Sequence, residues 1–159
     1  MTAVLQADGV TSCSVASSAF GATTLTADGT YYSCGSITLP TSGLWRITFQ
    51  ARTGGNTLSA YIHCAISTST SISNQIGTKR MLVERVAASS SNLNIGQNAE
   101  WYIDVADGAS GATIYVLAGY QGSVGSAFMQ DDQNGQTGVF ATKVRESTTG
   151  GTNVTNAGF

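Results

Sequence analysis

Histidine is the side chain best suited to acid–base chemistry near neutral pH, and this chain has one, His63. His63 lies in "LSAYIHCAI", on the same side of the alternating pattern as Tyr61. Catalysis would also need a nucleophile and an orienting group, yet no G-x-S-x-G string and no G-x-x-x-x-G-K-[ST] string occurs in the sequence. We therefore expect a packed or surface imidazole, no catalytic residue, and no enzymatic activity.

The carboxylates number nine and are scattered mostly through turns. The adjacent pair Asp131 and Asp132 lies in "MQDDQNGQTG", where Asn134 could join them as oxygen ligands of a hard cation. The spacing does not match an EF-hand, so a solvated turn is the favoured interpretation. We expect neither a bound metal nor a cofactor.

Positive charge is too sparse to attract nucleic acid. Lys79, Arg80 and Arg85 form the one basic cluster, and the net charge of the chain is −2. An exposed strand edge with salt bridges explains this cluster better than a nucleic-acid site. No apolar run approaches the roughly 18 residues of a membrane-spanning helix, so we expect no membrane partner.

The cysteines indicate a reduced protein. Cys13, Cys34 and Cys64 form no C-x-x-C pair, and Cys64 lies in an apolar row where a thiol packs as a small hydrophobe. The first ten residues lack both the basic and the apolar region of a signal peptide. Both features fit synthesis in a reducing cytoplasm.

The elements that would hold these residues have a period of two, which is typical of strands. The clearest alternating segments are 44–51, 58–66, 100–105 and 138–144, and weaker candidates are 10–15, 35–39, 79–86 and 92–95. Glycine-containing turns separate them, while residues 67–78 are polar and indicate a long loop. This pattern predicts an all-β, two-sheet antiparallel sandwich. Its expected core includes Trp45, Ile47, Phe49, Trp101, Ile103 and Phe140.

One predicted strand breaks the alternation. In "ATIYVLAGY", residues 112–120, both faces are apolar, so the strand needs cover on two sides. A loop of the same chain would supply that cover, but burial against other subunits is the favoured explanation. Residues 146–159, "ESTTGGTNVTNAGF", are polar and glycine-rich and indicate a flexible C-terminal arm after a domain at 1–145.

The segment "GSITLPTSGLWRITFQA", residues 35–51, resembles the jelly rolls of the complement-head and tumour-necrosis-factor type. In that family a strand ends at a proline, a Ser-Gly turn follows, and the next strand opens on an aromatic. "EWYIDVADGASGATIYVLAGYQG" and "TGVFATKV" look like its long penultimate strand and its closing strand, so that about residues 30–145 are covered. The resemblance implies a ten-stranded, two-sheet jelly roll that forms a homotrimer. It places the trimer interface at Ile114, Tyr115, Val116, Leu117 and Tyr120.

Composition indicates where such a trimer would act. Charged residues make up 10% of the chain, against about 25% in ordinary soluble domains. A charge-poor surface rich in Ser, Thr and Gly resembles bacteriophage virion proteins. Because the first candidate strand begins at residue 10, we expect no stalk before the predicted sheets. We expect a capsid decoration protein that is made in the host bacterial cytoplasm. It would bind the major capsid protein at threefold or quasi-threefold positions on the virion surface. The alternatives are a receptor-binding fibre tip, and a carbohydrate-binding module that uses Tyr61, Trp101 or Tyr102.

Overall fold

A computed structural model describes residues 15–55, 59–86, 93–122, 127–129 and 137–158. Residues 10–14 of the strand predicted at 10–15, Cys13 and the acidic pair Asp131–Asp132 lie outside the described residues. The described residues form one 3-10 turn, η1 (Ile72–Asn74), and eleven strands. The strands are β1 (Val15–Phe20), β2 (Thr23–Leu25), β3 (Tyr31–Leu39), β4 (Gly43–Gly55), β5 (Ser59–Ser67), β6 (Gln75–Val86), β7 (Leu93–Val105), β8 (Ala112–Gly122), β9 (Ala127–Met129), β10 (Thr137–Arg145) and β11 (Val154–Gly158).

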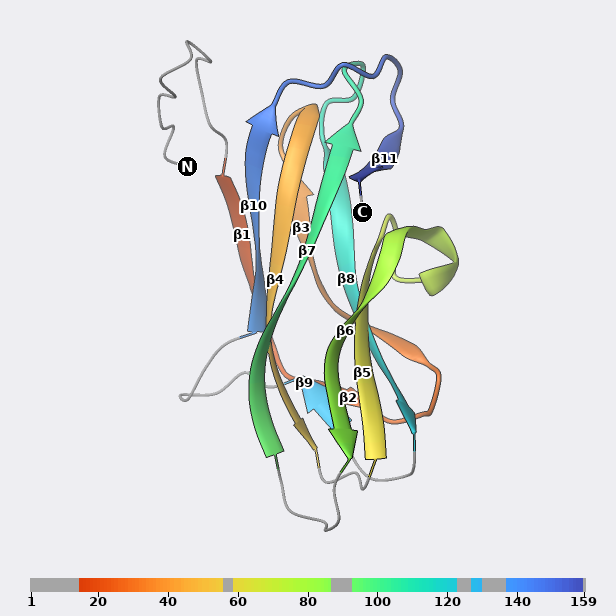
Figure 1. The fold of residues 1–159 in the computed structure, drawn as a ribbon. Coiled ribbons are helices and arrows are strands. Elements are labelled where there is room, and N and C mark those ends of the chain that lie inside the picture. Colours follow the sequence, from red (N-terminus) through yellow and green to blue (C-terminus); the bar gives the residue numbers. More distant parts are fainter. Residues whose placement is uncertain (1–14, 56–58, 87–92, 123–126, 130–136, 159) are drawn as a thin grey trace.

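Two antiparallel sheets face each other, as predicted, and their arrangement is consistent with a jelly-roll sandwich (Figure 1). The seven-stranded sheet has the order β1-β10-β4-β7-β11, with β9 pairing with both β4 and β2. The four-stranded sheet has the order β3-β8-β5-β6. Within the described part of the chain, no helix is long and apolar enough to cross a membrane.

The longest ladder joins β4 to β7 and runs without a register shift from Gly43, opposite Val105, to Gly55, opposite Leu93. Its inner face carries alternating large apolar side chains that are almost fully buried between the sheets. Five of the six residues expected in the core lie on this face: Trp45, Ile47, Phe49, Trp101 and Ile103. The alternation in the sequence therefore marks the inner side of the two central strands.

Two indole groups on this inner face donate hydrogen bonds to backbone carbonyls outside the ladder. The Nε1 of Trp45 donates to the carbonyl oxygen of Thr41 at 3.1 Å, in the turn that follows Pro40 and leads from β3 into β4. The Nε1 of Trp101 donates to the carbonyl oxygen of Thr78 at 3.0 Å, on β6 of the opposite sheet. Because a buried indole N–H needs a partner, each ring fixes both its own orientation and the segment that it reaches.

Phe140, the sixth residue expected in the core, is 48% exposed on the outer face of β10. Both rows of this strand contain apolar residues, and pairing with β4 decides which row points inward. Val139 lies opposite Phe49 and Ala141 opposite Ile47, so these two residues are buried and Phe140 points outward.

The strand with two apolar faces, β8, is covered by its own chain. Ile114, Val116 and Tyr120 are part of the core cluster, and Leu117 on the opposite face is 0% exposed. Four of the five residues expected at the trimer interface are thus at most 4% exposed in the single chain, while Tyr115 is half-buried. Strand β8 lies between β3 and β5, so both of its backbone edges are also paired within the chain.

The C-terminal segment, expected to be a flexible arm, contributes a strand to the sandwich. β11 extends the seven-stranded sheet beyond β7, with Val154 opposite Val105. The hydroxyl of Thr149 also donates to the Asp104 carboxylate at 2.6 Å. Without β11, the edge of β7 would leave backbone N–H and C=O groups unpaired. A segment rich in Thr and Asn can pair with these groups through its own backbone, so it needs no large apolar side chains to form this strand.

Replacing Trp101 with Phe tests the indole bond to β6. The change keeps most of the apolar volume but leaves the Thr78 carbonyl without this donor, so we expect the free energy of unfolding to fall by about 1–3 kcal/mol. Chemical denaturation measures the loss. Ile103→Val on the same strand removes only a methylene and should cost about 0.5–1.5 kcal/mol. Equal stability of Trp101→Phe and wild type would show that the bond is not needed.

Candidate binding surfaces

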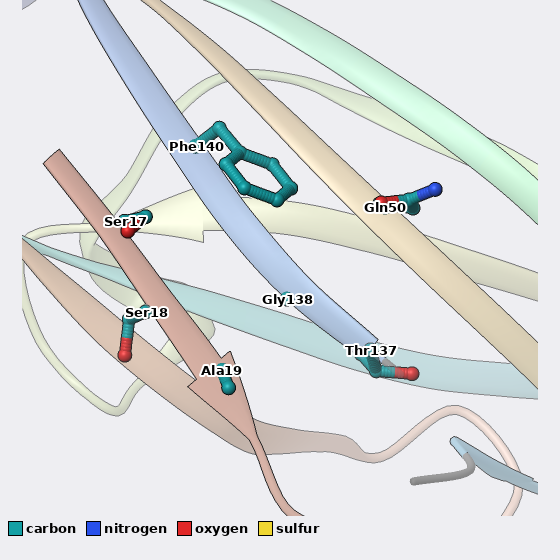
Figure 2. Close-up of a pocket in the computed structure, with 7 residues that line it drawn as sticks. All are labelled: Ser17, Ser18, Ala19, Gln50, Thr137, Gly138 and Phe140. Atoms are coloured by element: carbon teal, nitrogen blue, oxygen red, sulfur yellow. The ribbon is translucent and has the colours of Figure 1, made fainter. Parts of the chain in front are cut away.

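The outer face of the seven-stranded sheet has an exposed aromatic side chain beside a hollow. The ring of Phe140 stands between β10 and β4 (Figure 2). The adjoining hollow has a volume of about 200 Å³ and is lined by Ser17, Ser18, Ala19, Gln50, Thr137, Gly138 and Phe140. We call these seven residues the Phe140 surface.

The strand register explains how the hollow forms. Gly138 on β10 lies between Ala19 on β1 and Gln50 on β4. A Cβ atom on Gly138 would lie 3.0 Å from the carbonyl oxygen of Ser18, closer than side chains normally pack. The absence of a side chain at the centre of this row leaves the floor open, while Phe140 forms a wall two residues along β10.

The lining of the Phe140 surface carries no ionisable side chain. The charged residues that the structure describes on this face include Arg52, two residues from Gln50 on β4, whose backbone N–H donates to the Thr137 hydroxyl at 3.2 Å. They also include Arg46, opposite Thr142, and Glu100, opposite Thr48. The side chains of Arg46 and Glu100 form an ion pair at 2.6 Å, and the bond to Glu100 raises the pKa of Arg46. Val144, further along β10, is 40% exposed. The lining therefore combines a half-exposed aromatic with neutral hydroxyl and amide groups, and the charged residues of this face lie around it.

Of the residues that suggested chemistry in the sequence, the structure describes His63, Cys34 and Cys64. His63 is half-buried on the outer side of the four-stranded sheet. Cys34 and Cys64 are buried free thiols. Among the described residues, no three His, Cys, Asp or Glu side chains are grouped to hold a metal.

Sequence reasoning missed the Phe140 surface because it placed Phe140 in the core. Of the aromatics expected to contact a sugar, Trp101 is 1% exposed and unavailable, whereas Tyr61 is 38% exposed and Tyr102 is half-buried. The sequence did contain a signal for this surface, since Gly138 lies two residues before Phe140 in a strand with two apolar rows. Only the register of β10 with β1 and β4 shows that these two residues point outward.

No protein-family model matches the sequence, and no curated protein was found to be related to it. Solved structures of similar fold include the Eiger TNF of S. frugiperda, at 6% identity and a TM-score of 0.46 over 86% of this chain and 99% of that one. They also include infectious bursal disease virus, Gx strain, at 9% identity and a TM-score of 0.47 over 89% of this chain. The Gt strain of that virus gives 8% identity and a TM-score of 0.42 over 91% of this chain. This chain covers 34% and 39% of the two viral chains. Identities and TM-scores this low leave the function to be argued from the residues of this chain.

Thiol labelling tests the burial of the two cysteines. Burial raises the pKa of the Cys34 thiol to about 12, and burial also raises the pKa of Cys64. Because the thiolate is the reactive form, a Cys13→Ser variant should take up no iodoacetamide at pH 8 when folded. The same variant should take up two equivalents in denaturant. Fast labelling of either thiol in the folded protein would contradict the buried assignment.

Proposed function

We propose that this chain is a structural, non-enzymatic virion protein that decorates a capsid as a homotrimer. In this proposal it is made in the cytoplasm of a bacterial host and binds the major capsid protein at threefold or quasi-threefold positions on the outer shell. The observation that carries the proposal is the Phe140 surface, a set of residues without an ionisable side chain that includes an exposed aromatic ring.

Such a face suits protein–protein contact. The centres of protein interfaces are poor in charged residues and rich in aromatics, and a few large side chains supply most of the binding energy. Phe140 and Val144 are two of the three large apolar side chains counted as exposed among the described residues, and both lie on β10. We assign this face to contact between copies of the chain, in place of the β8 residues, which are buried within one copy.

A trimer fits the task of decoration. Three copies present three equivalent attachment surfaces, which matches a threefold site on an icosahedral shell. Simultaneous attachment of the three copies raises the overall affinity without strong individual contacts. The protein would stabilise the shell by joining neighbouring capsid subunits, which needs contact area and a rigid sandwich but no catalytic group.

The mass in solution tests the assembly. Light scattering should give about 49 kDa, three times the 16.3 kDa of one chain. Phe140→Asp should shift the protein to single chains, because burying an unpaired carboxylate at an interface costs several kcal/mol. The matched control is Tyr61→Asp on the opposite sheet, which should remain trimeric. Leu117→Asp would report on folding instead, because Leu117 is buried within one chain.

A wild-type mass of one chain would reject the trimer. A trimer that survives both Phe140→Asp and the milder Phe140→Gln would reject the assigned surface. Phe140 is half-exposed in the single chain, so neither substitution should prevent folding.

The number of copies per purified virus particle tests the biological role. Decoration predicts a fixed, high ratio of this chain to the major shell protein, measured by quantitative mass spectrometry. A handful of copies per particle would indicate a fibre tip. Absence from the particle would refute the virion assignment while leaving the mass measurement unaffected.

A further inference from the structure

The outer face of the four-stranded sheet carries a second hollow, with a volume of about 450 Å³. It is lined by Gly29, Tyr31, His63, Lys79, Gly119, Tyr120 and Gln121, which we call the Tyr31 hollow. Six of them lie on the four-stranded sheet and Gly29 lies in the turn before β3, whereas the Phe140 surface lies on the seven-stranded sheet, so the two sites are separate.

One row of the sheet builds the floor and the two walls. Tyr31 on β3 lies opposite Gly119 on β8, and Gly119 lies opposite His63 on β5. A Cβ atom on Gly119 would lie 2.7 Å from the carbonyl oxygen of Thr30 and 3.2 Å from the Tyr31 ring. Gly119 therefore leaves a depression in the sheet surface, with the ring of Tyr31 on one side and the ring of His63 on the other.

The next row widens the aromatic surface and adds a hydrogen-bonding group. Tyr61 and Gln121 lie opposite each other, both exposed. The rings of Tyr61 and His63 are nearly parallel, with an interplanar angle of 16° and centroids 6.3 Å apart. Parallel ring faces beside an amide suit a flat, partly apolar ligand whose edge carries hydroxyl groups.

The turn before β3 holds the rim of the hollow in place. The Asp28 carboxylate accepts a hydrogen bond from the backbone N–H of Gly122 at 3.1 Å. The N–H of Gly29, which has a φ of +69°, donates to the carbonyl oxygen of Tyr120 at 2.9 Å. The hollow is thus formed before any ligand binds, which lowers the entropic cost of binding.

Lys79 supplies the one positive charge of the lining. It lies on β6, and its Nζ is 4.6 Å from the centroid of the Tyr31 ring on β3. Within the part of the chain that the structure describes, Lys79 forms no ion pair. Burial and the nearby Lys79 lower the pKa of His63, so its imidazole is neutral near pH 7 and can donate one hydrogen bond and accept another.

We propose that the Tyr31 hollow binds a saccharide ring that carries a carboxylate, with the ring against Tyr31 and His63 and the carboxylate at Lys79. Apolar C–H faces of a sugar pack on the aromatic walls, while His63 and Gln121 bind its hydroxyl groups. A neutral sugar would leave Lys79 unused, and a small anion would leave the aromatic walls unused. The chemistry of the lining therefore favours a uronic-acid type of ligand over both.

Amide NMR on the full chain tests the proposal with methyl glucuronide as the probe. Methyl glucoside is the matched neutral sugar, and sodium acetate is the matched anion. Methyl glucuronide should shift the signals of Gly29, Gly119 and Gln121 with a Kd of about 1 mM, the range expected for a ligand of this size. Methyl glucoside should bind about tenfold more weakly, because it lacks the charge-assisted bond to Lys79.

Three variants complete the test. Lys79→Gln should weaken the glucuronide about tenfold and leave the glucoside unchanged, while Lys79→Arg should retain most of the affinity. Arg145→Gln, which removes an exposed positive charge at the end of β10 on the opposite sheet, should bind as wild type does. Three outcomes would overturn the proposal: no shift with either sugar, equal shifts with acetate, or glucuronide binding that Lys79→Gln does not alter. None of these results depends on the mass of the protein or on its number of copies per particle, so this site and the proposed function can fail separately.

Discussion

The ladder between β4 and β7 is the constraint on which the rest of the fold depends. It places Trp45 opposite Ile103 and Trp101 opposite Ile47, so the largest side chains share the centre of the inner face. Burying an indole ring costs free energy unless its N–H group donates a hydrogen bond to an acceptor. The acceptors are the Thr41 carbonyl in the turn between β3 and β4 and the Thr78 carbonyl on β6. Burial of these rings therefore positions both a connection between the sheets and a strand of the opposite sheet.

The outer faces depend on this inner packing through the register. Once β4 is fixed with its large apolar residues inward, β10 must pair so that Val139 and Ala141 also point inward, and Phe140 turns outward. The same logic holds on the other sheet, where the inward Val116 and Ala118 leave Gly119 to face outward between two rings. In each hollow a glycine occupies the middle of a row, and neighbours on adjacent strands form the walls. A sheet is otherwise a nearly flat surface, so omitting one side chain is a simple way to give it depth.

The sequence predicted those parts of the fold that one strand reveals by itself. Alternation in residues 44–51 and 100–105 identified the inner faces of β4 and β7, because one row is large and apolar and the other is polar. The same reasoning failed for β10 and β8, where both rows are apolar and only the neighbouring strands decide which row is covered. Strand β11 was missed because an added edge strand needs only backbone pairing. The Tyr31 hollow was beyond reach of the sequence, since Tyr31, His63 and Gly119 lie on three different strands.

The low charge of the chain makes the Phe140 surface easier to desolvate when a partner binds. An exposed ion pair such as Arg46–Glu100 contributes little to folding stability, because water screens its attraction. Its effect on association is larger, since two groups that neutralise each other attract less water and ions than two separate charges. A partner that approaches Phe140 would then displace water mainly from hydroxyl and amide groups, whose hydrogen bonds it can replace. A lining without charged groups and with an exposed aromatic ring therefore loses its water at a low cost in free energy. Attachment through contact area requires such a surface.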